Sequence, residues 1–182
     1  MRHPFDPIPA ALRRPVFIPL FMATVLVLFV MNSVGAPLNT DAAPQGIVSY
    51  ELAGDVPTVQ AILESWDGEA RVRAGFSLGI DFLFLVLYST TIAWALVWVS
   101  TRLPGRWASV GVWLAWGQWL AAALDSIENA ALWRLLVGTV TAPWPQVARW
   151  CALVKFALVI VGLLYVVVGG LLSRHRPQSV WG

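Results

Sequence analysis

Three acidic residues lie within stretches of the sequence that are otherwise apolar. Asp81 is in one of these stretches, and Asp125 and Glu128 are in the next, within LDSIENAAL. Asn129 follows Glu128 directly, and a further apolar stretch contains Lys155. An unpaired acid at the centre of a membrane helix costs about 2.5–3.5 kcal/mol, so we expect these groups to pair with one another.

The spacing of these residues places them on common helix faces. Asp125 and Asn129 are four residues apart and share a face. Asp81 and Tyr88 are seven residues apart, which is two turns, and share another. Counting about 1.5 Å per residue from the flanking aromatic and basic residues puts the acids, Asn129 and the lysine at one depth, in the outer part of a bilayer. The sequence predicts one polar site, in which Lys155 pairs with one or two carboxylates while Asn129 and Tyr88 donate hydrogen bonds.

The charge of this predicted site does not balance. Three acids beside a single lysine leave about two negative charges, and a site that takes up a proton, a cation or a small amphipathic ligand accounts for them. A second interpretation is a lipid-modifying membrane enzyme with Asp125 and Glu128 as acid and base. A third is a non-catalytic structural or assembly subunit, whose polar residues clamp helices together. The sequence leaves all three open, including whether the protein is an enzyme.

Several other chemistries lack the residues that they need. The two histidines, His3 and His175, are close to the chain ends, which excludes Ser-His-Asp catalysis and a His-carboxylate metal site among the acids. The single cysteine, Cys151, excludes an internal disulfide. The carboxylate and amide oxygens would suit Mg²⁺ or Ca²⁺, but the Lys155 ammonium opposes a metal ion. We therefore predict neither a metal nor a cofactor.

The composition is that of an integral membrane protein. Of the 182 residues, 58% are hydrophobic and 12% are charged, with a mean hydropathy of +0.71. A soluble domain is about 45–50% apolar and about 25% charged, so the composition excludes a typical soluble enzyme. The 12 lysines and arginines form no basic face, so no nucleic-acid partner is expected. The expected partners are membrane lipids and a small ligand or cation, and the chain is compatible with a homo-oligomer.

The apolar stretches are long enough to cross a bilayer as helices. A bilayer core about 30 Å thick needs roughly 20 apolar residues per helix, and four stretches supply them. They cover about residues 16–36, 76–100, 107–136 and 148–172. The predicted fold is an all-α integral membrane protein, a four-transmembrane-helix bundle that forms a single membrane domain over residues 1–182.

The distribution of arginines predicts the orientation of this bundle. One set of helix ends carries seven, namely Arg2, Arg13, Arg14, Arg102, Arg106, Arg174 and Arg176, and the other set carries Arg71, Arg73, Arg134 and Arg149. The positive-inside rule then places both termini in the cytoplasm, in a multi-pass protein of the cytoplasmic (inner) membrane. An alternative for the first span is a signal peptide cleaved after Val34-Gly35-Ala36.

The connection between the first two spans, residues 37–75, is predicted to lie outside and to contain a helix. The segment DVPTVQAILESW starts with a capping residue, Asp55, and its apolar residues follow the period of an amphipathic helix: Val59, Ile62, Leu63 and Trp66. We expect this helix to cap the bundle on its extracytoplasmic side. Asp67 is predicted to cap the next helix, which continues through Arg71 and Arg73 into the second span.

Overall fold

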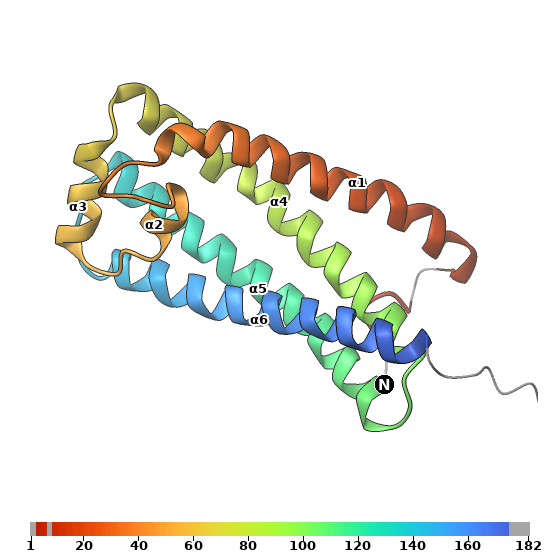
Figure 1. Cartoon of the computed structure of the whole chain (residues 1–182). Helices are drawn as coiled ribbons and strands as arrows, with labels where there is room; N and C mark the ends of the chain where they lie inside the picture. The colour runs from red at the N-terminus through yellow and green to blue at the C-terminus, as the bar shows by residue number, and fades with distance from the viewer. Residues whose placement is uncertain (1–2, 7–8, 175–182) are drawn as a thin grey trace, which may run out of the picture.

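The computed structural model describes residues 3–6 and 9–174, and it is all-helical over these residues (Figure 1). Arg2, His175 and Arg176, which entered the predictions above, lie outside the described residues. The elements are α1 (Ala10–Gly35), the 3₁₀ helix η1 (Ala36–Leu38), α2 (Ile47–Glu51), α3 (Val56–Ser65), α4 (Gly68–Ser100), α5 (Arg106–Val137) and α6 (Trp144–Arg174).

Three helices are long and apolar enough to cross a membrane. They cover Pro15–Leu38, Gly68–Ser100 and Trp144–Ser173, which indicates a membrane protein. α5 has 32 residues and is as long as its neighbours, but polar side chains interrupt its apolar sequence. The structure thus supports three of the four predicted spans by length and composition, and the fourth is considered under the proposed function.

Two predicted helix caps are formed. The Asp55 side chain accepts a hydrogen bond from the backbone N–H of Thr58 at 2.8 Å, at the start of α3. Asp67 accepts one from the N–H of Ala70 at 2.8 Å and starts α4, which continues without a break to Ser100. Both contacts satisfy backbone donors that a helix N-terminus leaves unpaired.

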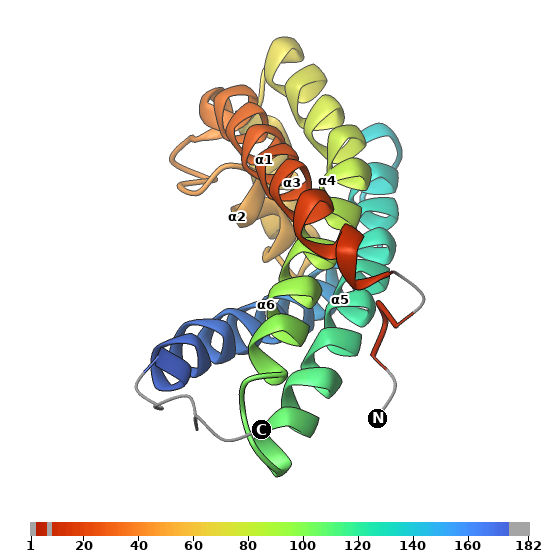
Figure 2. The same cartoon turned by 90° about the vertical axis from the view of Figure 1, so that its right-hand side faces the viewer.

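The long helices form an elongated bundle in which α4 and α5 pack along each other and α5 packs along α6. α1 packs against α4, where the Thr24 and Thr91 hydroxyls share a hydrogen bond of 2.8 Å, and α1 and α6 lie apart (Figures 1 and 2). The start of α1, the α4–α5 turn and the end of α6 lie at one end of the bundle, which we call the turn end. α2 and α3 lie at the other, which we call the α2–α3 end.

A compact core holds α2 and α3 against the long helices. The apolar face predicted for residues 55–66 is buried here: Val59 (0% exposed), Ile62 (1%), Leu63 (6%) and Trp66 (2%). The Tyr50 hydroxyl donates to the carbonyl oxygen of Leu132 in α5 at 3.0 Å, and the Trp66 indole N–H donates to the carbonyl oxygen of Leu38 at 2.9 Å. These contacts fix α2 beside α5 and α6.

Candidate functional site

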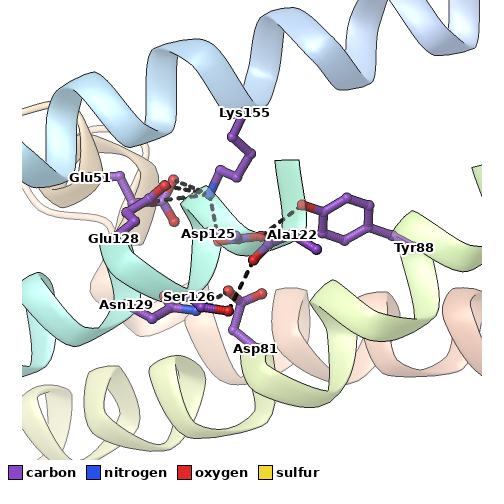
Figure 3. A network of polar contacts seen from close by, with 9 residues as sticks. All are labelled: Glu51, Asp81, Tyr88, Ala122, Asp125, Ser126, Glu128, Asn129 and Lys155. Carbon is purple, nitrogen blue, oxygen red and sulfur yellow. Dashed lines mark hydrogen bonds and ion pairs between the residues drawn. The ribbon is translucent and has the colours of Figure 1, made fainter. Parts of the chain in front are cut away.

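Lys155 of α6 lies at the centre of a buried group of polar side chains (Figure 3). Its ammonium nitrogen Nζ is 3.0 Å from Asp125 Oδ1. It is also 3.0 Å from Glu128 Oε1 and 2.9 Å from Glu128 Oε2. Asp125 and Glu128 are three residues apart on α5, so one helix presents both carboxylates to the same ammonium.

A third carboxylate comes from Glu51, at the end of α2. Its Oε2 is 3.7 Å from Lys155 Nζ, and its side chain is 13% exposed. The sequence prediction missed this residue, because the apolar sequence around it was assigned only to the loop between two spans. The excess of acids in that loop was the available signal, but it could not indicate which acid turns inward.

Two further contacts join α4 to this group. The Tyr88 hydroxyl donates to Asp125 Oδ2 at 3.0 Å, so Asp125 accepts from Tyr88 through one oxygen and from Lys155 through the other. One helical turn away on α5, the Asn129 side-chain amide donates to Asp81 Oδ2 at 2.5 Å. α4 therefore contributes a hydroxyl and a carboxylate to a network centred on α5.

We call these side chains the Lys155 cluster: Glu51, Asp81, Tyr88, Asp125, Glu128, Asn129 and Lys155. It contains all six residues singled out from the sequence, together with Glu51. Asp125 and Asn129 are each 2% exposed, Glu128 is 0% exposed and Lys155 is 6% exposed. Asp81 and Glu51 are partly buried. Because the cluster contains four carboxylates and one ammonium, it carries a formal charge of about −3 when every acid is ionised.

Glu51 is the acid of the cluster that lies outside the apolar spans. Burial raises the pKa of its carboxyl above the ordinary value of 4.5, and the negative charge of Asp125 adds to this effect. The Lys155 ammonium and a hydrogen bond with Glu128 act in the opposite direction and only partly offset burial. Glu51 thus tends to hold a proton at a pH at which an exposed glutamate has lost it.

Another buried polar side chain, outside the Lys155 cluster, lies two turns from Asp125 along α5, toward the turn end of the bundle. Gln118 of α5 is 0% exposed, and its Nε2 donates to the carbonyl oxygen of Leu158 in α6 at 3.0 Å. It crosses to α6 over Gly162, where a Cβ would lie 2.6 Å from Gln118 Nε2. Gln118 therefore links α5 to α6 directly.

The arrangement leaves little space for a metal ion at its centre. Lys155 Nζ occupies the position between the carboxylates where a cation would bind, in contact with oxygens of Glu51, Asp125 and Glu128. Among residues 3–6 and 9–174, no group of three or more His, Cys, Asp or Glu side chains is arranged to hold a metal ion.

Comparison with protein-family models, with curated proteins and with solved structures finds no match for this chain.

Proposed function

We propose that this protein is a four-span protein of the cytoplasmic membrane, whose Lys155 cluster binds protons and exchanges them with the extracytoplasmic side through Glu51. The observation that carries the proposal is that three carboxylates, those of Glu51, Asp125 and Glu128, surround a single ammonium, while a fourth, that of Asp81, is bonded to Asn129 beside them. Net charge in a low-dielectric interior is costly, and a buried carboxylate avoids that cost by taking up a proton.

The distribution of side chains on α5 supports a fourth span. Its 32 residues extend about 48 Å at 1.5 Å per residue, which exceeds the thickness of a bilayer core of about 30 Å. Arg106 and Arg134 are exposed near the two ends of the helix. Between them, the strongly polar residues are buried: Gln118, Asp125, Glu128 and Asn129. Large apolar side chains are exposed over the same stretch, including Trp113, Trp116, Leu120, Ile127 and Trp133. Such a surface suits contact with lipid.

The orientation follows from the arginines together with the shape of the bundle. Arg102 and Arg106 flank the α4–α5 turn, and α1 starts and α6 ends at that same end. The positive-inside rule assigns this end to the cytoplasm. α2 and α3 then lie on the extracytoplasmic side, where α3 caps the bundle and Glu51 connects the cluster to the solution.

A proton is favoured over a larger cation or an amine ligand because the Lys155 ammonium already fills the cation position. A ligand ammonium would have to displace Lys155 Nζ from oxygens 2.9–3.0 Å away. A proton needs only an oxygen lone pair, and Glu51 and Glu128 supply two carboxyls that interact with each other. When two carboxyl groups lie side by side, both cannot easily be ionised at once. Such a pair therefore tends to hold one proton between its two members.

The test is an infrared titration of the purified protein in lipid nanodiscs from about pH 4 to about pH 10. A protonated carboxyl has a carbonyl stretch that the ionised form lacks. We expect part of this band to titrate above the pH of ordinary glutamates, and that part to weaken in Glu51→Gln. Glu64→Gln, which changes an exposed acid of α3, is the matched control and should leave the band unchanged.

One result would overturn the proposal in favour of a structural clamp. If no carboxyl band titrates above the range of ordinary acids, or if the band is the same in wild type and in Glu51→Gln, the cluster does not exchange protons through Glu51. The cluster would then serve only to hold α2, α4, α5 and α6 together through fixed charges.

A further inference from the structure

A shallow groove separate from the Lys155 cluster lies between α4 and α5 near the α2–α3 end of the bundle. Its volume is about 480 Å³, and its lining residues come from two short segments: Arg71, Val72, Gly75 and Phe76 of α4, and Trp133, Leu136 and Val137 of α5. None of these residues belongs to the Lys155 cluster. The walls are apolar, and Arg71 supplies the charge at one end.

The groove owes its shape to the absence of a side chain at Gly75. A Cβ at this position would lie 3.3 Å from Trp133 Cζ3, so the indole packs directly over the glycine. Around it the surface is apolar and open, with Val72 72% exposed and Val137 63% exposed. In a chain whose apolar helices indicate a membrane protein, a surface of this kind contacts lipid rather than water.

Arg71 is held at the end of the groove, and within residues 3–6 and 9–174 no acid forms an ion pair with it. Its Nε donates to the carbonyl oxygen of Trp66 at 3.2 Å and its Nη2 to that of Leu63 at 2.7 Å, so both bonds go to neutral acceptors. The neighbouring Arg73 instead pairs with Glu69, with 2.6 Å between Nη2 and Oε1. The guanidinium of Arg71 is therefore fixed in place and can bind an anion.

We propose that this groove binds one phospholipid, with the lipid phosphate on Arg71 and the first part of an acyl chain along Gly75 and Trp133. A guanidinium at a membrane boundary, directly above an apolar groove between two helices, matches a phosphate joined to a hydrocarbon chain. An anionic headgroup fits best, because no carboxylate in the part of the chain that the structure describes pairs with the positive charge of Arg71. This inference stands independently of the proton site.

The size of the groove argues against a protein partner. Its wall on α4 covers residues 71–76, which is about 8 Å of helix at 1.5 Å per residue. A stable interface between proteins buries about 800 Å² on each partner, far more than so short a groove provides. A single acyl chain is narrow enough to lie in it.

Native mass spectrometry of the full chain, released from nanodiscs containing phosphatidylglycerol or phosphatidylcholine, tests the proposal. We expect wild type to retain one phosphatidylglycerol in preference to phosphatidylcholine. Gly75→Leu fills the groove from below and Val72→Trp fills it from the exposed side, and each should reduce retention about tenfold. The matched control for Gly75→Leu is Gly79→Leu, one turn further along α4, where no atom lies within 4 Å of an added Cβ. The matched control for Val72→Trp is Val86→Trp, at another exposed valine of α4.

The charge is tested by a second pair of variants. Arg71→Gln should abolish the preference for phosphatidylglycerol, whereas Arg73→Gln should keep it. Equal retention by wild type, Gly75→Leu and Val72→Trp would overturn the proposal, because it would show that bound lipid does not occupy the groove. A change in the dimer fraction of the groove variants without a change in lipid retention would also overturn it, in favour of a helix from a second copy.

Discussion

Both oxygens of the Glu128 carboxylate lie within 3.0 Å of Lys155 Nζ, although Glu128 is on α5 and Lys155 is on α6. The same ammonium also contacts Asp125 at 3.0 Å, so two acids of one helix share a single positive charge. Removing one partner of a buried ion pair leaves an uncompensated charge, which is costlier than replacing the whole pair by apolar groups. The stability of the bundle should therefore depend on Lys155 more than on any single acid.

Lys155→Met is expected to destabilise the protein by about 3–5 kcal/mol at neutral pH. Thermal unfolding in detergent at neutral pH measures this. The double variant Lys155→Met/Glu128→Gln serves as the control, and it should recover part of the stability because one uncompensated charge is gone. An equal loss in both variants would show that packing of the lysine chain, and not its charge, matters.

Tyr88→Phe is expected to lower the free energy of unfolding by about 1.5–3 kcal/mol, the usual range for a buried hydrogen bond to a charged group. The ring stays in place, and only the donor to Asp125 Oδ2 is lost. Thr90→Val on the same helix removes a hydroxyl that bonds to the carbonyl oxygen of Val86 at an exposed position, and it should change stability by less than about 0.5 kcal/mol. Similar effects from both variants would show that the bond from Tyr88 to Asp125 adds no stability beyond that of an ordinary helix hydroxyl.

The pH dependence of stability should change when Glu51 is replaced by Gln. Burial raises the pKa of Glu51 in the folded protein, so between its ordinary value of 4.5 and the raised value the folded state binds more protons than the unfolded state. The free energy of unfolding that Glu51 contributes is therefore largest below pH 4.5 and falls as the pH rises through this window.

Denaturation of wild type and Glu51→Gln in the same detergent, from about pH 5 to about pH 9, measures this contribution. We expect the free energy of unfolding of wild type to decrease more steeply with rising pH than that of Glu51→Gln. The difference between the two proteins should therefore shift in favour of Glu51→Gln toward alkaline pH. Glu64→Gln is the control on the neighbouring helix α3, and it should follow the wild-type curve. Parallel curves for wild type and Glu51→Gln would show that Glu51 is not buried against the cluster.

Much of this arrangement could be predicted from the sequence, because the signals are local. Asp55 and Asp67 mark their helices through contacts with residues three positions ahead. Apolar length gives the spans, and the rise of about 1.5 Å per residue predicts that acids on α4 and α5 lie level with Lys155. These inferences need no knowledge of how the helices pack.

Glu51 could not be predicted in the same way, because its position depends on contacts between distant parts of the chain. α2 has only five residues, too few to show a helical period. It is held by Tyr50, whose hydroxyl bonds to Leu132, 82 residues further along the chain. A related reason explains why α5 is not among the three helices that qualify as spans by composition: it contains polar residues, including Gln118, Asp125 and Glu128, that are buried against its neighbours.

Gly111→Ala is expected to loosen the turn end of the bundle, where α5 approaches both neighbouring helices. A Cβ on Gly111 would lie 2.5 Å from Tyr165 Oη of α6 and 2.6 Å from Ser100 Cβ of α4, so the helices must move apart. The same tyrosine donates to the carbonyl oxygen of Trp107 at 2.7 Å, a bond that this movement would break. Overpacking of this kind costs about 1–3 kcal/mol, measured by thermal unfolding in detergent.

The comparison for this variant is Gly79→Ala on α4, where no atom lies within 4 Å of the added Cβ. Alanine is the better helix former, so at such an open position it should leave stability unchanged or raise it by up to about 1 kcal/mol. The two substitutions should change the free energy of unfolding in opposite directions, and this difference separates the effect of helix packing from that of helix propensity. If Gly111→Ala is as stable as Gly79→Ala, then α4, α5 and α6 do not pack closely at Gly111. The alignment of α5 with α6 that places Lys155 beside Asp125 would then not be fixed by packing at this end of the bundle.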